Sequence, residues 1–307
     1  MNKWITYLRA TGAMFCWAIT FVWIKVALIT YRPFEIVFLR LVLASVLLFG
    51  IIHLFGLREK LEKGDLRYLM MVSFFEPFLY FIGEANGMQF VSPTLGSLII
   101  STIPIVTAIG AWLFLGEKLF VHIIIGLLVS FAGVAMISIT EPDLSGTLNG
   151  IMLLLLAVCA GMMYGITVRR ITLKYRSHTI VAWQSFFGML YMLPLFLIVD
   201  WGHFSTVRHS SQGLVTIAAM SLFGSVGAFV LFTGAIRELG VIRSNVFSNL
   251  IPVFTASLAF LILGDRLTPI VLGGVILTII GLFIAQYPDL KRLRYRPARV
   301  KSKPTGM

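Results

Sequence analysis

The sequence has few charged residues and almost no cysteine. Only 12% of its 307 residues are charged, about half the share that is usual in soluble domains, so too few polar side chains are present to cover a soluble surface. Both cysteines lie in apolar runs, which excludes a disulfide-stapled secreted fold. With 58% hydrophobic residues and a mean hydropathy of +0.94, what remains is a membrane protein that crosses the bilayer repeatedly.

Long apolar runs separated by polar breaks predict an all-α integral membrane protein with ten transmembrane helices. A helix needs about 20 mainly apolar residues to cross the hydrocarbon core, and the breaks carry Pro, Gly and charged residues. The first run is too long for a cleaved signal peptide and lacks a small-residue cleavage site. The predicted spans cover residues 4–29, 34–55, 66–88, 94–115, 120–140, 150–173, 180–199, 213–236, 244–263 and 268–287.

The positions of Lys and Arg predict that both ends of the chain lie in the cytoplasm. With the N-terminus inside and the spans alternating, 20 of the 25 basic residues fall in cytoplasmic segments. The exceptions are Arg32, Arg208 and Arg266 outside, and Lys25 and Arg40 within spans. The net charge of +12 therefore reflects topology, and we expect the basic tail to contact anionic membrane lipids rather than nucleic acid.

The two halves of the chain repeat each other. Residues 103–108 (IPIVTA) correspond to residues 251–256 (IPVFTA), and residues 115–119 (LGEKL) correspond to residues 263–267 (LGDRL), in both cases 148 positions later. Near Ile36 the offset is 144. Further pairs at the 148-residue offset are Gly126 with Gly274, Gly133 with Gly281, Ser73 with Ser221 and Phe75 with Phe223.

An odd number of spans in each copy predicts that the second copy is inverted in the membrane. After the five spans in residues 1–140 the chain is on the opposite side of the membrane, so the five spans in residues 150–287 cross it in the reverse direction. Residues 288–307 are predicted to form a cytoplasmic tail. Inverted repeats related by an axis in the membrane plane are typical of secondary transporters, which rock around a shared central site.

These residues resemble the drug/metabolite transporter superfamily, in its EamA-type branch. The resemblance rests on Trp17 and Lys25 in the first helix, Arg40 in the second, and the paired proline and LGEKL or LGDRL blocks, over about residues 8–140 and 150–286. It implies a ten-helix inverted-repeat fold in a bacterial inner membrane and no bound cofactor. It also implies movement of amino acids, their derivatives, nucleosides or other small metabolites, often outward, by alternating access.

Glu76 is the strongest candidate for a functional group inside a span. It lies roughly 15 Å along the third predicted span, near the middle of the membrane, where ionisable residues usually mark function. Pro77 follows it and interrupts the hydrogen bonding of the helix. The sequence leaves three interpretations open: a proton carrier, a contact for a substrate amine, and a structural Glu bonded to a neighbouring helix.

Four further residues extend this candidate site towards the outer face. Tyr80 and Glu84 follow Glu76 along the same helix, and Arg40 and Lys25 lie at a similar depth to Glu84, roughly 6–9 Å from the outer end of their spans. We expect an Arg40–Glu84 ion pair, as structural support or as an outer gate, because an unpaired buried charge is destabilising. Lys25 either extends to the headgroups or joins Arg40 in attracting a carboxylate.

Two polar stripes and two aromatic residues are related by the repeat. Each stripe precedes a proline that frees a backbone carbonyl, which favours a cavity lining beside a bending point, although hydrogen bonds between helices would explain the same residues. Trp17 and Tyr164 hold equivalent positions and are candidates for stacking on a substrate. The stripe residues are Ser97, Ser101, Asn245 and Asn249, and the candidate hinges are Pro77, Pro104 and Pro252.

The sequence contains no cluster that predicts catalysis or metal binding. The five histidines lie mostly in or beside loops, and neither a phosphate-binding loop nor a nucleophile elbow is present. We therefore expect no enzyme activity and no cofactor. The sequence predicts a secondary transporter of small polar metabolites. Export of amino acids or their derivatives is the favoured activity, with protons as a candidate coupling ion. The alternatives are efflux of lipophilic cations or drugs and, less favoured, a membrane lipid enzyme or a channel.

Overall fold

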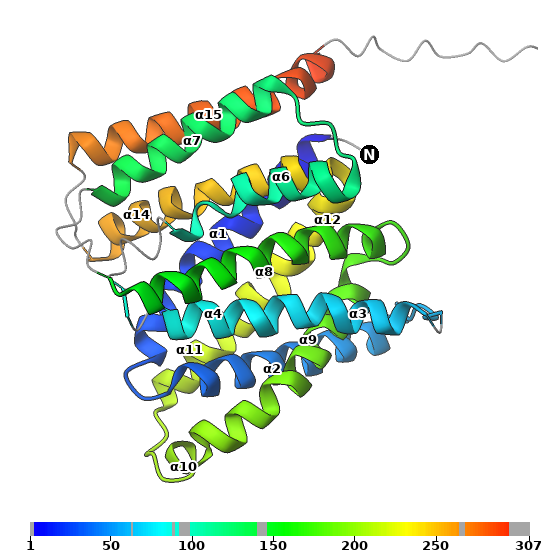
Figure 1. Ribbon diagram of the computed structural model, residues 1–307. Helices are drawn as coiled ribbons and strands as arrows, with labels where there is room; N and C mark the ends of the chain where they lie inside the picture. Colours follow the sequence, from blue (N-terminus) through cyan, green and yellow to red (C-terminus); the bar gives the residue numbers. More distant parts are fainter. Residues whose placement is uncertain are drawn as a thin grey trace, which may run out of the picture.

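Helices account for the secondary structure of the described chain. The computed structural model describes residues 3–62, 64–87, 90–91, 99–139, 146–263 and 268–294. Within these ranges there is no strand, and Val91 and Gly146 form an isolated bridge. The helices of the first half are α1 (Lys3–Ala27), α2 (Pro33–Leu54), α3 (Asp65–Ser73), η1 (Phe74–Leu79), α4 (Tyr80–Gly87), α6 (Ile103–Leu115) and α7 (Val121–Ile139) (Figure 1).

The second half follows the same pattern of long and interrupted helices. Its elements are α8 (Leu148–Thr172), α9 (Ser177–Leu195), η2 (Phe196–Asp200), α10 (Trp201–Phe204), α11 (Ser211–Met220), η3 (Ser221–Ala228), α12 (Phe229–Leu239), α13 (Val241–Val246), η4 (Phe247–Asn249), α14 (Leu250–Leu263) and α15 (Pro269–Arg294). The segments η1, η2 and η3 are π-helical and η4 is a 3₁₀ turn.

Six helical stretches within the described ranges are long and apolar enough to cross a membrane. The hydrocarbon core of a bilayer contains no water to bond the backbone, so a spanning segment must pair its own N–H and C=O groups, as a long apolar helix does. The stretches are Pro33–Leu54, Asp65–Gly87, Leu148–Thr172, Ser177–Phe204, Ser211–Leu239 and Pro269–Tyr287, and Ile103–Leu115 and Val121–Ile137 are shorter apolar helices. The all-helical, multi-pass membrane character predicted from the sequence is supported, whereas the number of ten spans stays a prediction.

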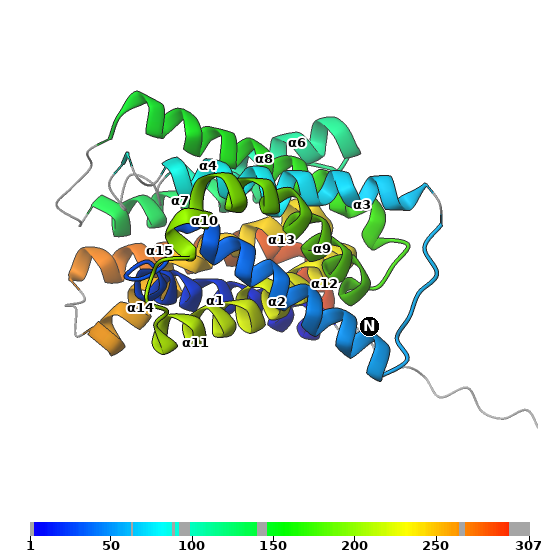
Figure 2. The same ribbon diagram turned by 90° about the horizontal axis from the view of Figure 1, so that it is seen from below.

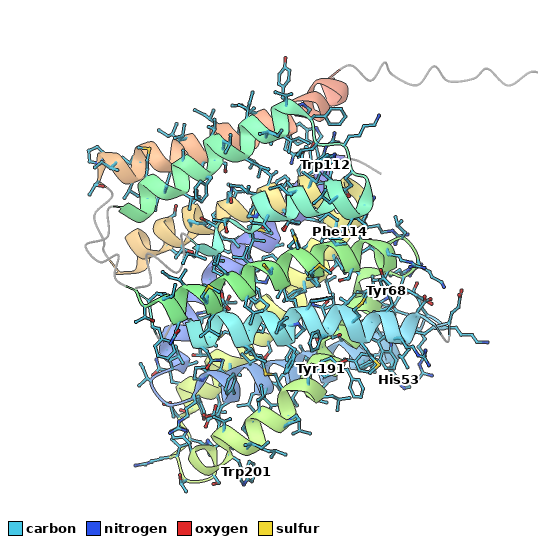
Figure 3. All side chains as sticks on the ribbon, viewed as in Figure 1. His53, Tyr68, Trp112, Phe114, Tyr191 and Trp201 are labelled. Carbon is cyan, nitrogen blue, oxygen red and sulfur yellow. The ribbon has the colours of Figure 1, made fainter. Side chains whose placement is uncertain are left out.

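The outer surface of the bundle is apolar, as lipid contact requires. Large side chains such as Trp112, Phe114 and Trp201 are exposed and point away from the helices that carry them (Figure 3). Large exposed apolar surfaces are rare on soluble monomers. The high content of hydrophobic residues in the sequence therefore corresponds to an apolar outer surface in the structure.

Local sequence explains where several helices begin and end. Pro33 begins α2, a position that suits a residue without an N–H group. The side chains of Thr147 and Ser210 accept hydrogen bonds from Gly150 N and Gly213 N, each at 3.2 Å, at the beginning of α8 and α11. The left-handed Gly116, with φ of 64°, ends α6.

The helices lie side by side, and both described ends of the chain are at the same end of the bundle. In Figure 1, α1 begins and α15 ends on the right, together with the connection from α2 to α3. The view from below places the beginning of α1 and the α2–α3 connection at one end again (Figure 2). Helices α7 and α15 run together along one edge (Figure 1).

The contact between α7 and α15 is reciprocal. A Cβ atom on Gly126 would lie 2.6 Å from the carbonyl oxygen of Gly281, and a Cβ atom on Gly274 would lie 2.7 Å from that of Gly133. Gly126 and Gly274 are equivalent in the repeat, as are Gly133 and Gly281, so the second contact is the first with the two halves exchanged. Such exchange is expected when two copies pack across a twofold axis.

The serine residues that precede η1 and η3 show the same equivalence. Ser73 donates a hydrogen bond to the carbonyl oxygen of Leu69 at 2.8 Å, and Ser221 donates to that of Ile217 at 2.9 Å. Both serines are fully buried. The π-helical segments η1 and η3 thus occur at equivalent places in the two halves, and both contact helices of the other half.

Candidate functional site

The third predicted span is interrupted at Glu76. This residue has extended backbone angles (φ −146°, ψ 122°) inside η1, and its peptide bond to Pro77 is cis. Because Pro77 has no N–H group, the helix loses a hydrogen bond here. Beside this break, the carbonyl oxygen of Glu76 accepts a hydrogen bond of 3.0 Å from Nε2 of Gln184 in α9. A side chain from the second half of the chain therefore bonds to the backbone at the break in the first half.

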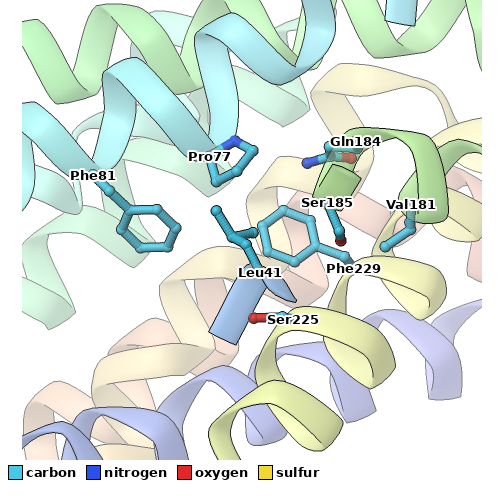
Figure 4. Close-up of a pocket in the computed structure, with 8 residues that line it drawn as sticks. All are labelled: Leu41, Pro77, Phe81, Val181, Gln184, Ser185, Ser225 and Phe229. Carbon is cyan, nitrogen blue, oxygen red and sulfur yellow. The ribbon is translucent and has the colours of Figure 1, made fainter. Parts of the chain in front are cut away.

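A small pocket lies beside this break, between the two halves (Figure 4). Its volume of about 10 Å³ is close to what one water molecule needs. The pocket is thus almost closed in this conformation. Its lining residues come from α2, η1, α4, α9, η3 and α12, and they are Leu41, Pro77, Phe81, Val181, Gln184, Ser185, Ser225 and Phe229.

Most of the pocket lining consists of pairs that the repeat relates. The offset of 148 residues relates Pro77 to Ser225 and Phe81 to Phe229, and the local offset of 144 relates Leu41 to Ser185. A pocket lined by equivalent residues from both copies lies where the copies meet. Among transporters built from repeats, the substrate site is expected at such an interface.

Arg40 is the charged counterpart of Gln184 in this arrangement. Its side chain is 5% exposed and its Nε atom has no hydrogen-bond partner. The guanidinium lies over the ring of Phe81, 5.5 Å from its centre. Its Nη2 atom lies 3.2 Å from the position that a Cβ atom on Gly224 would occupy. Since Gly224 is the equivalent of Glu76, Arg40 approaches η3 in the way that Gln184 approaches η1.

The direct ion pair predicted between Arg40 and Glu84 is not formed. Within the described residues no contact of 4.0 Å or less joins the two side chains, although their charges are close enough to attract each other. The carboxylate of Glu84 instead accepts a hydrogen bond of 3.0 Å from the hydroxyl of Tyr80, one turn away on the same helix. Tyr80 is therefore a hydrogen-bond partner of Glu84, and Arg40 acts on the same carboxylate only at longer range.

The two predicted aromatic residues lie against a wall of the pocket. Trp17 packs on Phe229 and Phe232 with ring centres 5.2 and 5.1 Å apart, and Tyr164 packs on Phe229 at 6.1 Å. Tyr164 is 2% exposed and its hydroxyl makes no hydrogen bond of good geometry. The same hydroxyl lies near the side chains of Gln184 and Thr233 and near the charge of Glu76.

Gln184, which lines the pocket, and Thr233, which lies near Tyr164, are buried polar residues that sequence reasoning did not identify. Both are buried, and Gln184 Oε1 and Thr233 Oγ1 make no hydrogen bond of good geometry, although both side chains lie near the hydroxyl of Tyr164. The repeat contained a signal for Gln184, because the 144-residue offset that relates Ile36 to Ile180 also relates Arg40 to Gln184. No signal in the sequence identified Thr233.

The predicted polar stripes lie away from this pocket. Asn249 donates a hydrogen bond of 2.9 Å to Ser130 in α7, and Asn245 donates one of 3.0 Å to the carbonyl oxygen of Val241. Ser101 is buried. These residues make contacts within and between helices, and they are absent from the lining of the small cavity. Ser97 and the side chain of Lys25 lie outside the described part of the structure.

The candidate hinge prolines stand where helices begin. Pro104 is the second residue of α6, after a turn at Ser101 and Thr102, and Pro252 lies in the first turn of α14, after the 3₁₀ segment η4. A proline is tolerated at the beginning of a helix because its missing N–H group has no partner there. These prolines therefore coincide with breaks that are already present in the backbone, as Pro77 does.

Charged contacts join the two halves at the ends of the helices. Glu117 accepts hydrogen bonds from Val241 N (2.9 Å) and Ile242 N (3.1 Å) at the beginning of α13, and Arg169 lies 3.9 Å from Glu117. Arg169 also donates to the carbonyl oxygen of Arg237 at 2.7 Å, at the end of α12. The junction between α12 and α13 is thus held by residues from α8 and the α6–α7 connection.

A second group of contacts joins the α2–α3 and α8–α9 connections. Tyr175 donates to Asp65 at 2.7 Å and accepts from Glu62 N at 3.0 Å, while Lys174 pairs with both Glu62 and Asp65. These carboxylates raise the pKa of Lys174 above its ordinary value. Across the described ranges, no three His, Cys, Asp or Glu side chains are grouped to hold a metal ion.

Comparison with known proteins identifies the family. The sequence pattern of the EamA-like transporter family matches residues 4–139 and, again, residues 148–287. The chain belongs to the EamA-like transporter family. The resemblance predicted from the sequence is therefore confirmed, with one EamA region in each half.

Individual relatives of this EamA family member are also transporters by name. An "uncharacterized transporter" of Archaeoglobus fulgidus is 25% identical over 282 residues, which cover 91% of this chain and 96% of the relative. The "uncharacterized transporter YetK" of Bacillus subtilis is 26% identical, with 80% and 76% covered. A "probable terminal-alkyne amino-acid exporter" of Streptantibioticus cattleyicolor is 26% identical over 278 residues, with 91% and 92% covered.

A solved crystal structure supports the arrangement of the helices in this EamA family member. It superposes with a TM-score of 0.80 and covers 93% of this chain and 99% of that chain, at 14% sequence identity. At this identity the likeness concerns the fold alone. Family and relatives together indicate a membrane transporter, in agreement with the expectation that the protein is not an enzyme.

Proposed function

We propose that the protein is a secondary transporter that exports amino acids or related small polar metabolites by alternating access. Two inverted repeats of five spans each, in residues 1–140 and 150–287, would rock around the pocket between them. The reciprocal glycine contacts of α7 and α15 and the pocket lining from equivalent residues support this proposal. The similarity to a probable amino-acid exporter favours the substrate class.

The observation that carries the proposal is the buried guanidinium of Arg40 beside the pocket. Its Nε atom lacks a hydrogen-bond partner, and within the described residues no carboxylate lies within 4.0 Å of it, although the charge of Glu84 attracts it from further away. A buried charge is costly unless a counter-charge and hydrogen bonds compensate it. A substrate carboxylate would supply both, because a guanidinium binds carboxylates with two parallel hydrogen bonds.

Glu76 would interact with the positive charge involved in transport, which is either a proton or the amine of the substrate. Two contacts support this assignment: the neighbouring Pro77 lines the pocket, and Gln184, which also lines it, donates a hydrogen bond to the carbonyl oxygen of Glu76. In the proposed mechanism it either carries a proton in exchange for substrate or meets the substrate amine. Lys25, Tyr80 and Glu84 remain candidates for the path between the pocket and the outer face, with Lys25 assisting in the attraction of a carboxylate.

The proposed setting is a bacterial inner membrane with both termini in the cytoplasm. The bias of basic residues towards one side supports this orientation, as does the common end of α1 and α15 in Figure 1. Tagging of both termini for protease or antibody access tests it. Termini on opposite faces of the bilayer would overturn the inverted repeat and, with it, the alternating-access mechanism.

Counterflow in proteoliposomes tests the transport itself. Proteoliposomes that contain the purified protein are preloaded with one unlabelled amino acid, and the uptake of the same labelled amino acid is measured. The variant Arg40→Gln should lower the rate at least about tenfold, since hydrogen bonds to a charged group contribute about 1.5–3 kcal/mol. Arg208→Gln, in an exposed loop, is the matched control and should behave like the wild type. Equal rates in the two variants would contradict the assignment of Arg40.

Proton coupling is tested separately with Glu76→Gln. If Glu76 carries the proton, this variant loses the dependence of counterflow and net flux on a pH gradient. An unchanged pH dependence removes Glu76 from the coupling reaction and leaves its contact with the substrate amine. Metals and other cofactors are not required at any step of this proposal.

Efflux of lipophilic cations is a second candidate function, because the pocket has aromatic walls. Phe81 and Phe229 line it, and Trp17 packs on Phe229. Aromatic faces attract cations, whereas the buried positive charge of Arg40 repels them. Resistance of cells to toxic cations on expression of the wild-type protein, without amino-acid counterflow, would favour this function over the first.

A further inference from the structure

A cluster of polar contacts joins the two halves at the end of the bundle where the described ends of the chain lie. Tyr175, just before α9, donates a hydrogen bond of 2.7 Å to Asp65, and Thr179, in the first turn of α9, donates one of 2.5 Å to Glu59. Asp65 begins α3, and Glu59 lies in the α2–α3 connection. We call these four residues the inner cluster.

A second cluster joins the two halves at the opposite end. Tyr31, just before α2, shares a hydrogen bond of 3.3 Å with Nδ1 of His209 and stacks on its ring, with the ring centres 5.9 Å apart. Glu35, in the first turn of α2, contacts Nδ1 of His203 at 2.7 Å. His203 belongs to α10, which lies at the other end of the bundle from the α2–α3 connection (Figure 1). We call these four residues the outer cluster.

The repeat relates the two clusters. The local offset of 144 residues relates Tyr31 to Tyr175 and Glu35 to Thr179. In each cluster the partners of these residues come from the connection between the second and third predicted spans of the other half. Each cluster is therefore the other one with the two halves exchanged. Both are formed while the pocket, at about 10 Å³, is almost closed, and alternating access requires one end to open at a time.

The two clusters differ in how they respond to pH. Asp and Glu, which supply the acceptors of the inner cluster, keep their charge between about pH 5.5 and 8.5. The outer cluster instead has His203 and His209 among the partners, and histidine changes its charge within this range. Of the two clusters, the outer one alone therefore changes its charge near neutral pH.

His203 is the counter-charge that Glu35 can use. The side chain of Glu35 is fully buried, whereas that of His203 is 28% exposed. Arg32 donates its backbone N–H to Glu35 at 2.8 Å, but its guanidinium lies 3.5 Å from Asp200. Two carboxylates thus share one guanidinium unless His203 carries a proton, and an uncompensated buried charge is costly. The other titratable or charged side chains on the described elements around this contact are Tyr31, His209 and the exposed Arg208.

We propose that His203 and Glu35 form an external proton site that holds the outer end of the transporter closed when His203 is protonated. A hydrogen bond between two charged groups is stronger than one in which the donor is neutral. Protonation and closure therefore favour each other, so the outer end is most firmly closed at low external pH and opens more readily as the pH rises. This inference rests on the proposed alternating-access function and adds a control by the external medium.

The test measures how easily the pocket is reached from outside, and it needs no substrate. Ser225→Cys places a thiol in the pocket lining of a chain whose own cysteines are removed by Cys16→Ala and Cys159→Ala. Right-side-out membrane vesicles are exposed to a membrane-impermeant thiol reagent between pH 5.5 and 8.5. The quantity of interest is the opening ratio, the labelling rate with His203→Gln divided by the rate with His203 at the same pH. The pH dependence of the thiol itself cancels in this ratio.

We expect the opening ratio to be close to one at pH 8.5 and to reach roughly three to ten at pH 5.5, as for one partly exposed charged hydrogen bond. His203→Lys, which keeps a positive charge, should label slowly over the whole range. A purely structural role of His203 would not move these two variants in opposite directions. His209→Gln is the matched control: it removes the other histidine of the outer cluster and should keep the pH dependence of the parent chain.

The outcomes separate the proton site from the proposed function. An opening ratio that does not change with pH overturns the proton site, whereas alternating access stands. Loss of the pH dependence in His209→Gln, with His203→Gln unchanged, overturns the assignment to His203 and Glu35. Ser185→Cys, also in the pocket lining, is a second reporter. If neither reporter is labelled from outside at any pH, the outer end does not open, and alternating access fails together with the proton site.

Discussion

A single methyl group on Gly274 should destabilise the protein, whereas the same change on its neighbour Gly273 should not. A Cβ atom on Gly274 would lie 2.7 Å from the carbonyl oxygen of Gly133 and 2.8 Å from Cγ1 of Ile137. On Gly273 the nearest atom would be the flexible end of Met136, at 3.4 Å. The added methyl group at Gly274 would clash with the backbone of α7, whereas the one at Gly273 would touch the Met136 side chain at an ordinary van der Waals distance.

The size of the effect follows from these distances. Ordinary contacts require α7 and α15 to separate by roughly 0.7 Å at Gly274, and overpacking of this kind costs about 1–3 kcal/mol. The higher helix propensity of alanine offsets about 0.5–1 kcal/mol. The net loss for Gly274→Ala is then about 0–2.5 kcal/mol, with a central value of about 1 kcal/mol, whereas Gly273→Ala should be neutral or slightly stabilising.

The assay is thermal unfolding of the detergent-solubilised protein at one fixed scan rate, because such unfolding is commonly irreversible. For a chain of 307 residues a loss of about 1 kcal/mol should lower the Tm by about 1.5 °C, and a loss of about 2.5 kcal/mol by about 4 °C. Combining Gly274→Ala with Gly133→Ala should cost less than the two separate changes together, since both act on one crossing that the first has already opened. Equal melting of Gly274→Ala, Gly273→Ala and the wild type would refute the reasoning.

Three further predictions concern the connections between helices. Glu117→Ala leaves two N–H groups of α13 unpaired and should lower the free energy of unfolding by about 1–2 kcal/mol. Lys118→Ala, at an exposed site, should change it by no more than about 0.5 kcal/mol, and comparing the Tm values of the two variants tests this. Tyr175→Phe removes the hydrogen bond to Asp65, and hydrogen–deuterium exchange should show faster exchange in the α2–α3 connection, with unchanged exchange as the contrary result. Because the pKa of Lys174 is raised, its stabilisation is complete below the ordinary value of about 10.4 and is lost only above the raised one. The Tm difference between Lys174→Met and the wild type should thus be constant from pH 6 to 9, and a steady decline over this range would contradict it.

The general architecture was predictable because the membrane restricts it. Long apolar runs can only be helices where no water satisfies the backbone, so the ranges predicted around residues 34–55 and 150–173 agree closely with α2 and α8. The repeat was visible in matched motifs, and family membership followed from it. The break at Glu76 was also predictable, because Pro77 interrupts helical hydrogen bonding wherever it occurs inside a helix.

The direction of individual side chains was not predictable. The pairing of Arg40 with Glu84 was inferred from similar depth alone, and the structure gives the Glu84 carboxylate to Tyr80 instead. For Asn249 the sequence left two interpretations open, a cavity lining and a hydrogen bond between helices, and the structure shows a hydrogen bond to Ser130 in a helix that is distant in sequence. Depth and residue type restrict which groups can meet, whereas rotation of each helix about its axis decides which do.

By itself the sequence determined the helical membrane fold, the duplication and the residue types available for a site, since these depend on local hydropathy and on direct comparison of the two halves. Only the tertiary structure brought Gln184 to the break at Glu76 and His203 to Glu35. The partners lie on different helices, and their proximity depends on how closely those helices pack and which faces they turn inward, quantities that no local pattern contains.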